Sequence, residues 1–265
     1  MKIVTDASEL VQGCAFVPTM GALHSGHQSL FTIAASRSEQ VLASIFVNPL
    51  QFESAEDLEK YPRTPEKDIE IAEAAGVTHL WLPHYEELYP EGFEKVLAGP
   101  LGNIYEGASR PGHFDGVVTV VSRLFELAQP KSAIFGEKDF QQLALIKKMK
   151  SGVDIIAAPT IRESDGLALS SRNVRLDPAA RKAATVISRA LFAASNEQNL
   201  ESAQSVMLHV LSEETTFSCD YAEIIDEDEF TQATDSTLHA RAIIAGWING
   251  IRLIDNMAMK QGARS

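Results

Sequence analysis

A strand, a loop with two glycines and a helix follow one another near the start of the chain, and this order constrains the fold more than any other feature. Residues 14–17 form an apolar run between a glycine and a proline, which is typical of a buried strand. After the segment 18–27, apolar residues recur at helical spacing. This spacing predicts a helix that begins near Gly26 or His27 and ends at about Ser38.

The loop between this strand and this helix suits a phosphate group. A helix N-terminus presents unpaired backbone N–H groups with partial positive charge, and Gly21 and Gly26 let the backbone come close. His24 and His27 lie three residues apart, so we expect both rings on one side of the first turn, where they could donate to phosphate oxygens or give up a proton. A capped helix start and a pair of zinc ligands are the alternative interpretations. The flanking strand and glycines favour phosphate, although neither the dinucleotide fingerprint nor a P-loop occurs here.

Strand and helix patterns go on alternating after this unit. Further strands are expected at Val41 to Val47, Val77 to Leu82, Ala133 to Phe135 and Val153 to Ala158. Helices are expected from Pro65, capped by Thr64, to Gly76, and from about Val117 to Ala128. The segment 90–111 is rich in glycine and proline and predicts loops with one short strand at 96–98. The alternation implies right-handed crossovers and a parallel sheet.

The second half of the chain has a different order, because its helices precede its strands. Helices are expected at 179–194 and 201–212, followed by strands at 221–225 and 241–245. We therefore expect an α/β protein with two domains. Residues 1–160 would form a Rossmann-like parallel-sheet domain that carries the phosphate-binding loop. Residues 161–265 would form a smaller, lid-like α+β domain.

Polar side chains follow the expected strand ends. Asn48 and Gln51 come just after the second strand, and Lys138 and Gln142 follow a later one. The carboxyl ends of parallel strands are where ligands bind in open sheets. A lysine can reach a phosphate chain there, and a glutamine offers both donors and an acceptor. The competing interpretation of Lys138 is an ordinary charged helix start.

Two further polar clusters suit anions. Arg110 and His113 stand at the mouth of an apolar helix, although a solvated loop explains them equally well. The run 170–173, Ser-Ser-Arg-Asn, offers hydroxyls, an arginine fork and an amide, which all bind phosphate oxygens. Serine-rich turns are common, so this run is weak evidence alone.

Composition excludes several classes of protein. The formal net charge of −13 over 265 residues argues against nucleic acid as the main partner, while a small anionic substrate needs only a local basic pocket. Cys14 and Cys219 lie far apart, so neither a disulfide framework nor a cysteine-rich zinc site is expected. No run is long enough to span a bilayer, and the first ten residues do not resemble a signal peptide. We expect a cytoplasmic protein without a membrane partner.

Five motifs, in order, closely resemble the pantothenate synthetase family. They are His24-Ser-Gly-His27, Phe46 to Phe52, Glu106 to Phe114, Gly136 to Gln142 and Leu169 to Asn173, and Arg252 to Asn256 resembles the family's closing strand. The resemblance runs from about Phe16 to the end, and it implies that the domain of residues 1–160 binds ATP and pantoate. It implies condensation of pantoate with β-alanine, driven by ATP with Mg²⁺ present, through a pantoyl adenylate. Pyrophosphate and then AMP would leave, and the enzyme would be a homodimer.

The resemblance also implies a role for each matching residue. His27 would donate a proton to the phosphate, with His24 and Lys138 beside it as catalytic groups. ATP would be bound by Met20, Gly21, Ala22, Leu23, His24, Ser25, Gly26, His27, Gly136, Glu137, Lys138, Asp139, Ile161, Leu169, Ser170, Ser171 and Arg172. Gln51 and Gln142 would hold pantoate, and Gln51 would also place β-alanine. Asn48, Tyr61 and His113 would be second contributors, and no metal ligand is assigned.

The chain departs from the family pattern in two respects. The segment before Phe16 is shorter than usual, so the first helix is expected to be trimmed or missing and the sheet edge weaker. Leu50 and Leu169 stand where methionine is frequent or allowed, a change that nearly conserves volume. Two other functions remain open: another adenylyl or cytidylyl transferase with the same His-x-Gly-His loop, and a nucleotide-binding module without turnover. Retention of His27, Lys138 and Ser171 speaks against the module.

Overall fold

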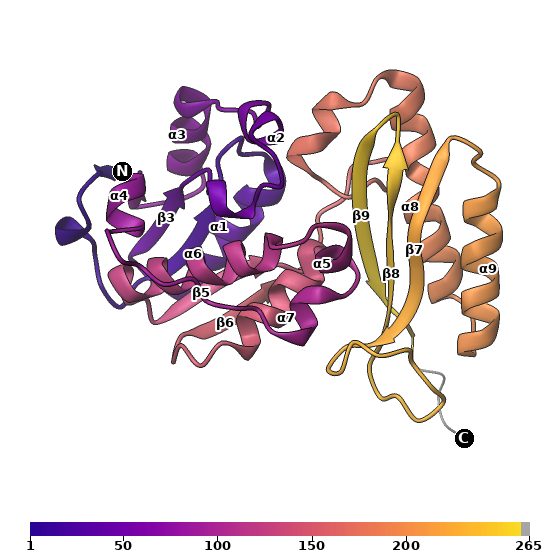
Figure 1. Cartoon of the computed structure of the whole chain (residues 1–265). Helices are drawn as coiled ribbons and strands as arrows, with labels where there is room; N and C mark the ends of the chain where they lie inside the picture. Colours follow the sequence, from indigo (N-terminus) through magenta and orange to yellow (C-terminus); the bar gives the residue numbers. More distant parts are fainter. Residues whose placement is uncertain (261–265) are drawn as a thin grey trace. The chain divides into compact units, whose positions relative to one another are not determined.

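The computed structural model describes residues 1–260 and divides the chain into two compact units (Figure 1). The first unit is Met1–Thr160, and the second begins at Ile161. The first holds a six-stranded parallel sheet with helices, and the second a three-stranded antiparallel sheet with helices. The predicted α/β class with a smaller α+β part is thereby confirmed.

The strands of the first unit form a doubly wound sheet. They are β1 (Lys2–Val4), β2 (Ala15–Thr19), β3 (Val41–Ile45), β4 (His79–Trp81), β5 (Ser132–Gly136) and β6 (Asp154–Ala158). Their order is β1-β4-β3-β2-β5-β6, and every pair is parallel. The chain order therefore reverses between β2 and β5. In sheets of this type, ligands bind at the carboxyl ends of the strands beside such a reversal.

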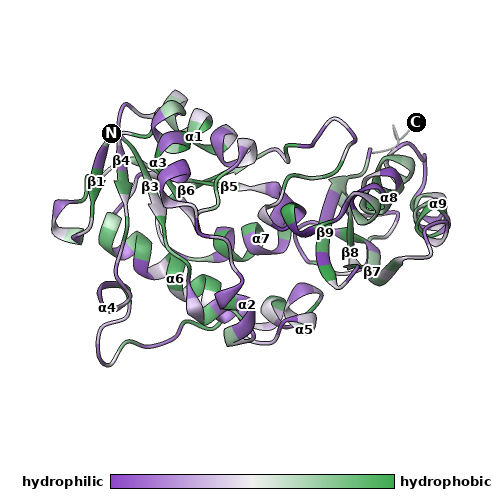
Figure 2. Ribbon diagram, turned by 90° about the horizontal axis from the view of Figure 1, so that it is seen from above, coloured by the Kyte–Doolittle hydropathy of each residue, from purple (hydrophilic) through white to green (hydrophobic). Residues whose placement is uncertain are grey.

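Helices cover both faces of this sheet because the side chains of β2 alternate between two apolar clusters. Phe16 packs with residues of α6 (His113–Ala128) and α7 (Phe140–Lys148), whereas Val17 packs with α1 (Ser25–Arg37) and α3 (Pro65–Ala74). The inner strands accordingly carry mostly apolar residues (Figure 2). Both faces of a parallel sheet are normally buried in this way.

Pro18 explains why β2 and β5 part at their carboxyl ends. β2 pairs with β3 from Ala15 to Thr19, but with β5 only at Ala15 and Phe16. Ala15 and Thr19 form backbone hydrogen bonds on the β3 side, so strand alternation turns Pro18 toward β5, where its missing N–H cannot donate. The expectation that the strand ends before Pro18 is wrong by two residues, because the β3 side needs no donor from proline.

The long connection between β4 and α6 contains helical turns and no strand. Its helices are α4 (Tyr85–Leu88), η3 (Pro100–Asn103) and α5 (Glu106–Ser109). The strand expected at 96–98 is wrong. The Val96 N–H donates to Thr119 Oγ1 at 2.9 Å and the Ala98 N–H donates to Asp115 Oδ1 at 2.8 Å. Side chains of α6 thus accept hydrogen bonds from the N–H groups that would otherwise pair with a neighbouring strand.

The segment before β2 forms β1 and a single turn of 3-10 helix, η1 (Ala7–Glu9). Among the described residues no α-helix precedes α1. β1 pairs only with β4, so a three-residue strand closes this edge of the sheet. Two short helical elements follow β3, namely η2 (Pro49–Gln51) and α2 (Ala55–Glu59).

The second unit packs two helices against one antiparallel sheet. The helices are α8 (Pro178–Ser195) and α9 (Leu200–Ser212), and the strands β7 (Phe217–Asp226), β8 (Ala240–Ile248) and β9 (Ile251–Ala258) pair in chain order. Leu191, Met207 and Ile244 belong to its apolar core. The strands extend beyond the expected ranges at both ends. Within residues 1–260, no helix combines the length and apolar character needed to cross a membrane.

Candidate active site

His24 and His27 cap the start of α1 with their own rings. His24 is the N-cap residue, and its Nδ1 accepts from the Gly26 N–H at 3.1 Å. Nδ1 of His27 accepts from the His24 N–H at 3.3 Å, and the two ring centroids lie 4.1 Å apart. The expected placement on one side of the first turn is confirmed. The expectation of unpaired amides is wrong for His24 and Gly26, because the histidine rings satisfy both.

This capping fixes the tautomer of each ring. A neutral imidazole donates from one nitrogen and accepts at the other. Because Nδ1 accepts in both rings, the neutral forms of His24 and His27 carry their proton on Nε2. Each ring can therefore offer one Nε2–H donor to a ligand while it caps the helix. A capped helix start and a phosphate site are compatible here.

Burial favours the neutral form of both histidines. It is the main cause that lowers the pKa of His27 from 6.5 to about 3, and the positive charges of His24 and Lys138 act in the same direction while Asp139 opposes them. Burial also lowers the pKa of His24, followed by the charge of Lys138. A neutral ring with such a low pKa donates a hydrogen bond rather than a proton.

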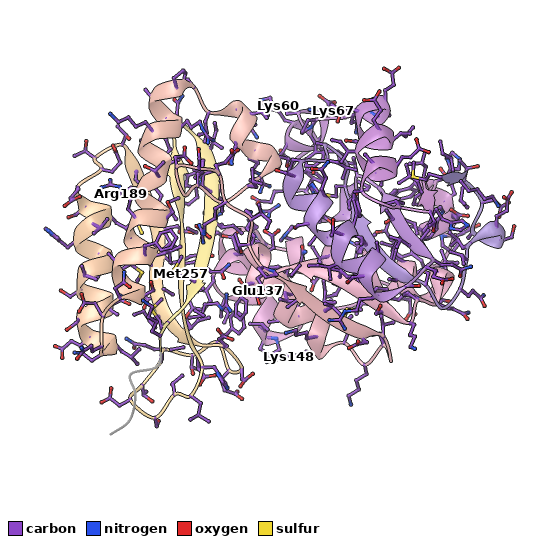
Figure 3. The ribbon with its side chains drawn as sticks, turned by 180° about the vertical axis from the view of Figure 1, so that it is seen from behind. Lys60, Lys67, Glu137, Lys148, Arg189 and Met257 are labelled. Carbon is purple, nitrogen blue, oxygen red and sulfur yellow. The ribbon has the colours of Figure 1, made fainter. Side chains whose placement is uncertain are left out.

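The connection from β5 to α7 supplies a cation beside the histidines. Gly136 ends β5, and η4 (Glu137–Asp139) follows it directly; Figure 3 marks Glu137. Lys138 Nζ lies 3.3 Å from Asp139 Oδ1 and its side chain is 18% exposed, against 49% for Asp139. The charges of Lys138 and Asp139 influence both imidazoles. The strand reversal thus brings together the two connections that the motifs singled out.

Asp68 of α3 holds the loop that leads into the histidines, and the sequence interpretation missed it. Its Oδ1 accepts from the Leu23 N–H at 2.7 Å and its Oδ2 from the Ala22 N–H at 3.0 Å. Thr64 Oγ1 also donates to Asp68 at 3.0 Å, so Thr64 makes no cap with its side chain, contrary to expectation. Asp68 precedes the buried Ala72 by four residues, and a charge on that buried face was the available signal.

Asn48 and Gln51, the two polar residues after β3, bind each other. Asn48 Nδ2 donates to Gln51 Oε1 at 3.0 Å and to the Gly116 carbonyl at 3.1 Å. The hydroxyl of Tyr89, which the motifs did not reveal, donates to Asn48 Oδ1 at 2.8 Å. Gln51 Nε2 in turn donates to Met20 Sδ at 3.1 Å. The expected pantoate residues thereby reach the expected nucleotide loop.

His113 joins this group through the backbone of Gln51. Its Nδ1 lies 2.9 Å from the Gln51 carbonyl, which can only accept, so Nδ1 donates. Its Nε2 then accepts from the Arg110 guanidinium at 3.2 Å, and Arg110 also pairs with Glu53 at 3.1 Å. Both ring nitrogens of His113 are engaged by protein groups. The ring of Tyr61 packs edge-on against the ring of Phe52, with 5.7 Å between the two centroids.

The adjacent glutamines of α7 have different surroundings. Gln141 is buried, accepts from the Glu106 N–H at 3.1 Å, and donates to the Leu101 and Ile104 carbonyls at 2.8 Å each. Gln142 is half-buried, and its side chain has no hydrogen-bond partner among the described residues. Gln141 therefore anchors a loop, whereas the carboxamide of Gln142 is available to a ligand.

The remaining expected ATP residues belong to the second unit. Ile161 and Leu169 are paired, because the Leu169 N–H donates to the Ile161 carbonyl at 3.0 Å. Ser170 caps η5 (Ser171–Arg175) by accepting from the Arg172 N–H at 3.2 Å. Their part in ATP binding stays a prediction.

Metal donors do not cluster in the part of the chain that the structure describes. No group of three or more histidine, cysteine, aspartate or glutamate side chains there could hold a metal ion. A zinc site at His24 and His27 would need such a group, and both Nδ1 atoms already cap the helix. Mg²⁺ needs fewer protein ligands, because it commonly binds through one or two carboxylates and the phosphates of its substrate.

A doubly wound sheet with a capped histidine pair and a lysine beside its strand reversal defines a nucleotide-binding α/β enzyme. The family model for pantoate-beta-alanine ligase matches residues 2–258. The chain therefore belongs to the pantoate-beta-alanine ligase family.

Individual relatives agree with this assignment. A pantothenate synthetase from Acidothermus cellulolyticus is 46% identical over 93% of this chain and 86% of its own length. The crystal structure of pantothenate synthetase from Thermus thermophilus has a TM-score of 0.92 at 44% identity and covers 97% of this chain and 99% of that one. A Francisella tularensis pantoate-beta-alanine ligase, solved with a βγ-ATP compound and β-alanine, has a TM-score of 0.77 at 34% identity and covers 97% of both chains. The predicted family and enzyme class are confirmed, in preference to the alternative transferase or binding module.

Proposed function

We propose that this ligase condenses pantoate with β-alanine through a pantoyl adenylate. A carboxylate is a poor acyl donor until one of its oxygens is attached to a good leaving group, and ATP supplies that group. The observation that carries the proposal is the contact between the two expected sites. The Gln51 side chain reaches Met20, in the loop that leads to the histidine pair, at 3.1 Å.

The first step joins an oxygen of the pantoate carboxylate to the α-phosphorus of ATP. The bond from that phosphorus to the bridging oxygen breaks, and pyrophosphate leaves. In the second step the amine of β-alanine attacks the acyl carbon, the bond from that carbon to the AMP oxygen breaks, and the amine loses a proton. AMP leaves with one oxygen that came from pantoate.

The first unit supplies donors for the charge that moves in the first step. The Nε2–H groups of neutral His24 and His27 donate to phosphate oxygens, and the ammonium of Lys138 stabilises the departing pyrophosphate. This assignment gives His27 a hydrogen bond to offer, in agreement with its low pKa. The ATP assignment also includes residues of both units, namely Met20 to Ser25, Gly26, Gly136, Glu137, Asp139, Ile161, Leu169, Ser170, Ser171 and Arg172.

Pantoate is held by Gln51 and Gln142, and Gln51 also places β-alanine. Asn48 supports this proposal because it fixes the Gln51 carboxamide at 3.0 Å while it is itself held by Tyr89. His113 acts through the Gln51 backbone, which it contacts at 2.9 Å. Tyr61 contributes from the side of Phe52.

The proposal also includes Mg²⁺, the oligomeric state of the enzyme and its cellular compartment. An ion that binds through the phosphates of ATP needs few protein ligands, so it does not require a three-ligand cluster, and the described residues contain none. When bound, Mg²⁺ would neutralise phosphate charge. We also propose that the enzyme is a cytoplasmic homodimer and that its second unit is a lid-like domain.

An isotope experiment tests the proposed chemistry. Pantoate labelled with ¹⁸O in its carboxylate is incubated with enzyme, Mg²⁺-ATP and β-alanine, and the nucleotide product is examined by ³¹P NMR and mass spectrometry. We expect AMP that carries one ¹⁸O atom. ADP, or AMP without label, would contradict the adenylate.

A further inference from the structure

Asp68 is a buried acid to which the proposed chemistry gives no role. It is 1% exposed, although its neighbour Lys67 on the same helix lies at the surface (Figure 3). Burial of a carboxylate is costly unless hydrogen bonds compensate it. Its partners therefore indicate what the residue is for.

Two of its three partners are backbone donors of the loop that precedes the histidine pair. The Leu23 and Ala22 amides donate to its two oxygens at 2.7 and 3.0 Å, and the Thr64 hydroxyl donates at 3.0 Å. No ion pair forms at Asp68 within residues 1–260. The loop backbone thus provides most of the stabilisation of the carboxylate, and His24 is the next residue after Leu23.

The loop is shaped to receive this carboxylate. A Cβ at Gly21 would lie 2.9 Å from Asp68 Oδ2 and 3.0 Å from Ile45 Cγ2. Gly21 has a φ of +80° and Ala22 a φ of +50°. A residue with a side chain at positive φ persists only when its surroundings hold it there. The hydrogen bonds that the Ala22 and Leu23 N–H groups donate to Asp68 hold Ala22 in this conformation.

We propose that Asp68 is a positioning residue for the adenylation step. Its two bonds to the Ala22 and Leu23 amides fix the backbone that enters His24, and so fix where the Nε2–H donors of His24 and His27 lie. This inference rests on the proposed function. A shift of about 1 Å in a catalytic group can cost a hundredfold in rate.

Asp68→Asn is the test variant. The amide has the same shape but sets an NH₂ donor against a backbone N–H donor. The measurement is pantoate-dependent exchange of labelled pyrophosphate into ATP. We expect kcat for exchange to fall at least about tenfold, with the KM values for pantoate and ATP changed by less than about threefold.

Glu87→Gln is the matched control. Glu87 also accepts two N–H donors within the first unit, from the Ala7 backbone and from Trp81 Nε1, at residues with no assigned role. It should keep kcat within about twofold, since it does not touch the histidine loop. Thr64→Val removes one of the three donors to Asp68 and serves if Asp68→Asn does not fold. It should lower kcat in the same direction but by less.

A second readout separates positioning from loss of stability. In protein labelled with ¹⁵N-histidine, the nitrogen shifts of His24 and His27 report which ring nitrogen carries the proton. We expect the Nε2–H form to dominate in wild type and Glu87→Gln, and to lose that dominance in Asp68→Asn.

Wild-type kcat in a folded Asp68→Asn or Thr64→Val variant would overturn the role of Asp68. Equal losses in Asp68→Asn and Glu87→Gln, with unchanged histidine shifts, would overturn it as well. A wild type without any exchange would instead contradict the proposed function, and the tautomer experiment would still decide the role of Asp68.

Discussion

The side-chain amide of Gln51 donates to the sulfur of Met20 at 3.1 Å, and this contact joins η2, which follows β3, to the loop after β2. Asn48 holds the other end of the same carboxamide at 3.0 Å. Pantoate that binds Gln51 would therefore lie beside the loop that is proposed to hold ATP. This proximity is what a reaction between carboxylate and α-phosphate requires.

The first prediction concerns substrate recognition by Gln142. Gln142→Ala should raise the KM for pantoate roughly five- to a hundredfold, because a lost polar contact to the substrate costs about 1 to 3 kcal/mol. The KM for ATP should change much less. Steady-state kinetics with each substrate varied in turn would measure both.

Gln141→Ala is its control. Gln141 anchors the loop that contains Leu101 and Ile104, so its loss should lower the melting temperature more than it changes the KM for pantoate. Equal effects of Gln142→Ala on pantoate and ATP would point to a structural role instead.

The second prediction distinguishes a hydrogen bond from a proton at His27. In His27→Asn, the amide oxygen stands near the position of Nδ1 and can still cap His24, but the Nε2–H donor is lost. In His27→Gln, the amide nitrogen stands near Nε2 and can donate without titrating. His27→Asn should lose at least about a hundredfold in kcat, and His27→Gln should keep about ten times more activity. Equal rates in the two variants would argue that the donor atom of His27 is unimportant.

The third prediction concerns stability and pH. The pKa of His27 is about 3 in the folded protein against an ordinary value of 6.5. Between these values the unfolded chain binds a proton at His27 that the folded chain does not, so the free energy of unfolding decreases as pH falls. The slope from this group reaches at most ~1.4 kcal/mol per pH unit. Urea unfolding of wild type and His27→Gln at pH 7.5 and 5 should show the weaker pH dependence in the variant; identical slopes would contradict it.

The fourth prediction tests the cation at the end of β5. The charge of Lys138 lowers the pKa of His24, after the larger effect of burial. Lys138→Met should therefore raise the pKa of His24, which an NMR titration of the ring would record, and should slow pyrophosphate exchange as well. Lys131→Met is the control outside the histidine site. An unchanged pKa and rate in Lys138→Met would remove Lys138 from the site.

Local patterns sufficed to predict the elements that carry the proposed chemistry. The apolar run at 14–17 and the helical spacing after His27 lie within one strand-loop-helix unit, and the structure has both elements, β2 and α1. The motif from Gly136 to Gln142 could also be predicted locally, because it directly follows the apolar run of β5. Pairing of the two histidine rings followed from their separation by three residues.

Long-range contacts account for what the sequence concealed. The expected strand at 96–98 is wrong because its backbone N–H groups donate to the side chains of Thr119 and Asp115, which lie about twenty residues later in the chain. Asp68 holds amides that lie more than forty residues earlier. β1 is only three residues long and depends on pairing with β4. Propensity within a short window contains none of this information.

Exchange of labelled pyrophosphate into ATP tests the central claim most directly. The enzyme is incubated with Mg²⁺-ATP and labelled pyrophosphate, with and without pantoate and β-alanine. Since the adenylate forms before the amine reacts, we predict exchange that requires pantoate and proceeds without β-alanine. Exchange that requires β-alanine but not pantoate, or a reaction that yields ADP, would contradict the account.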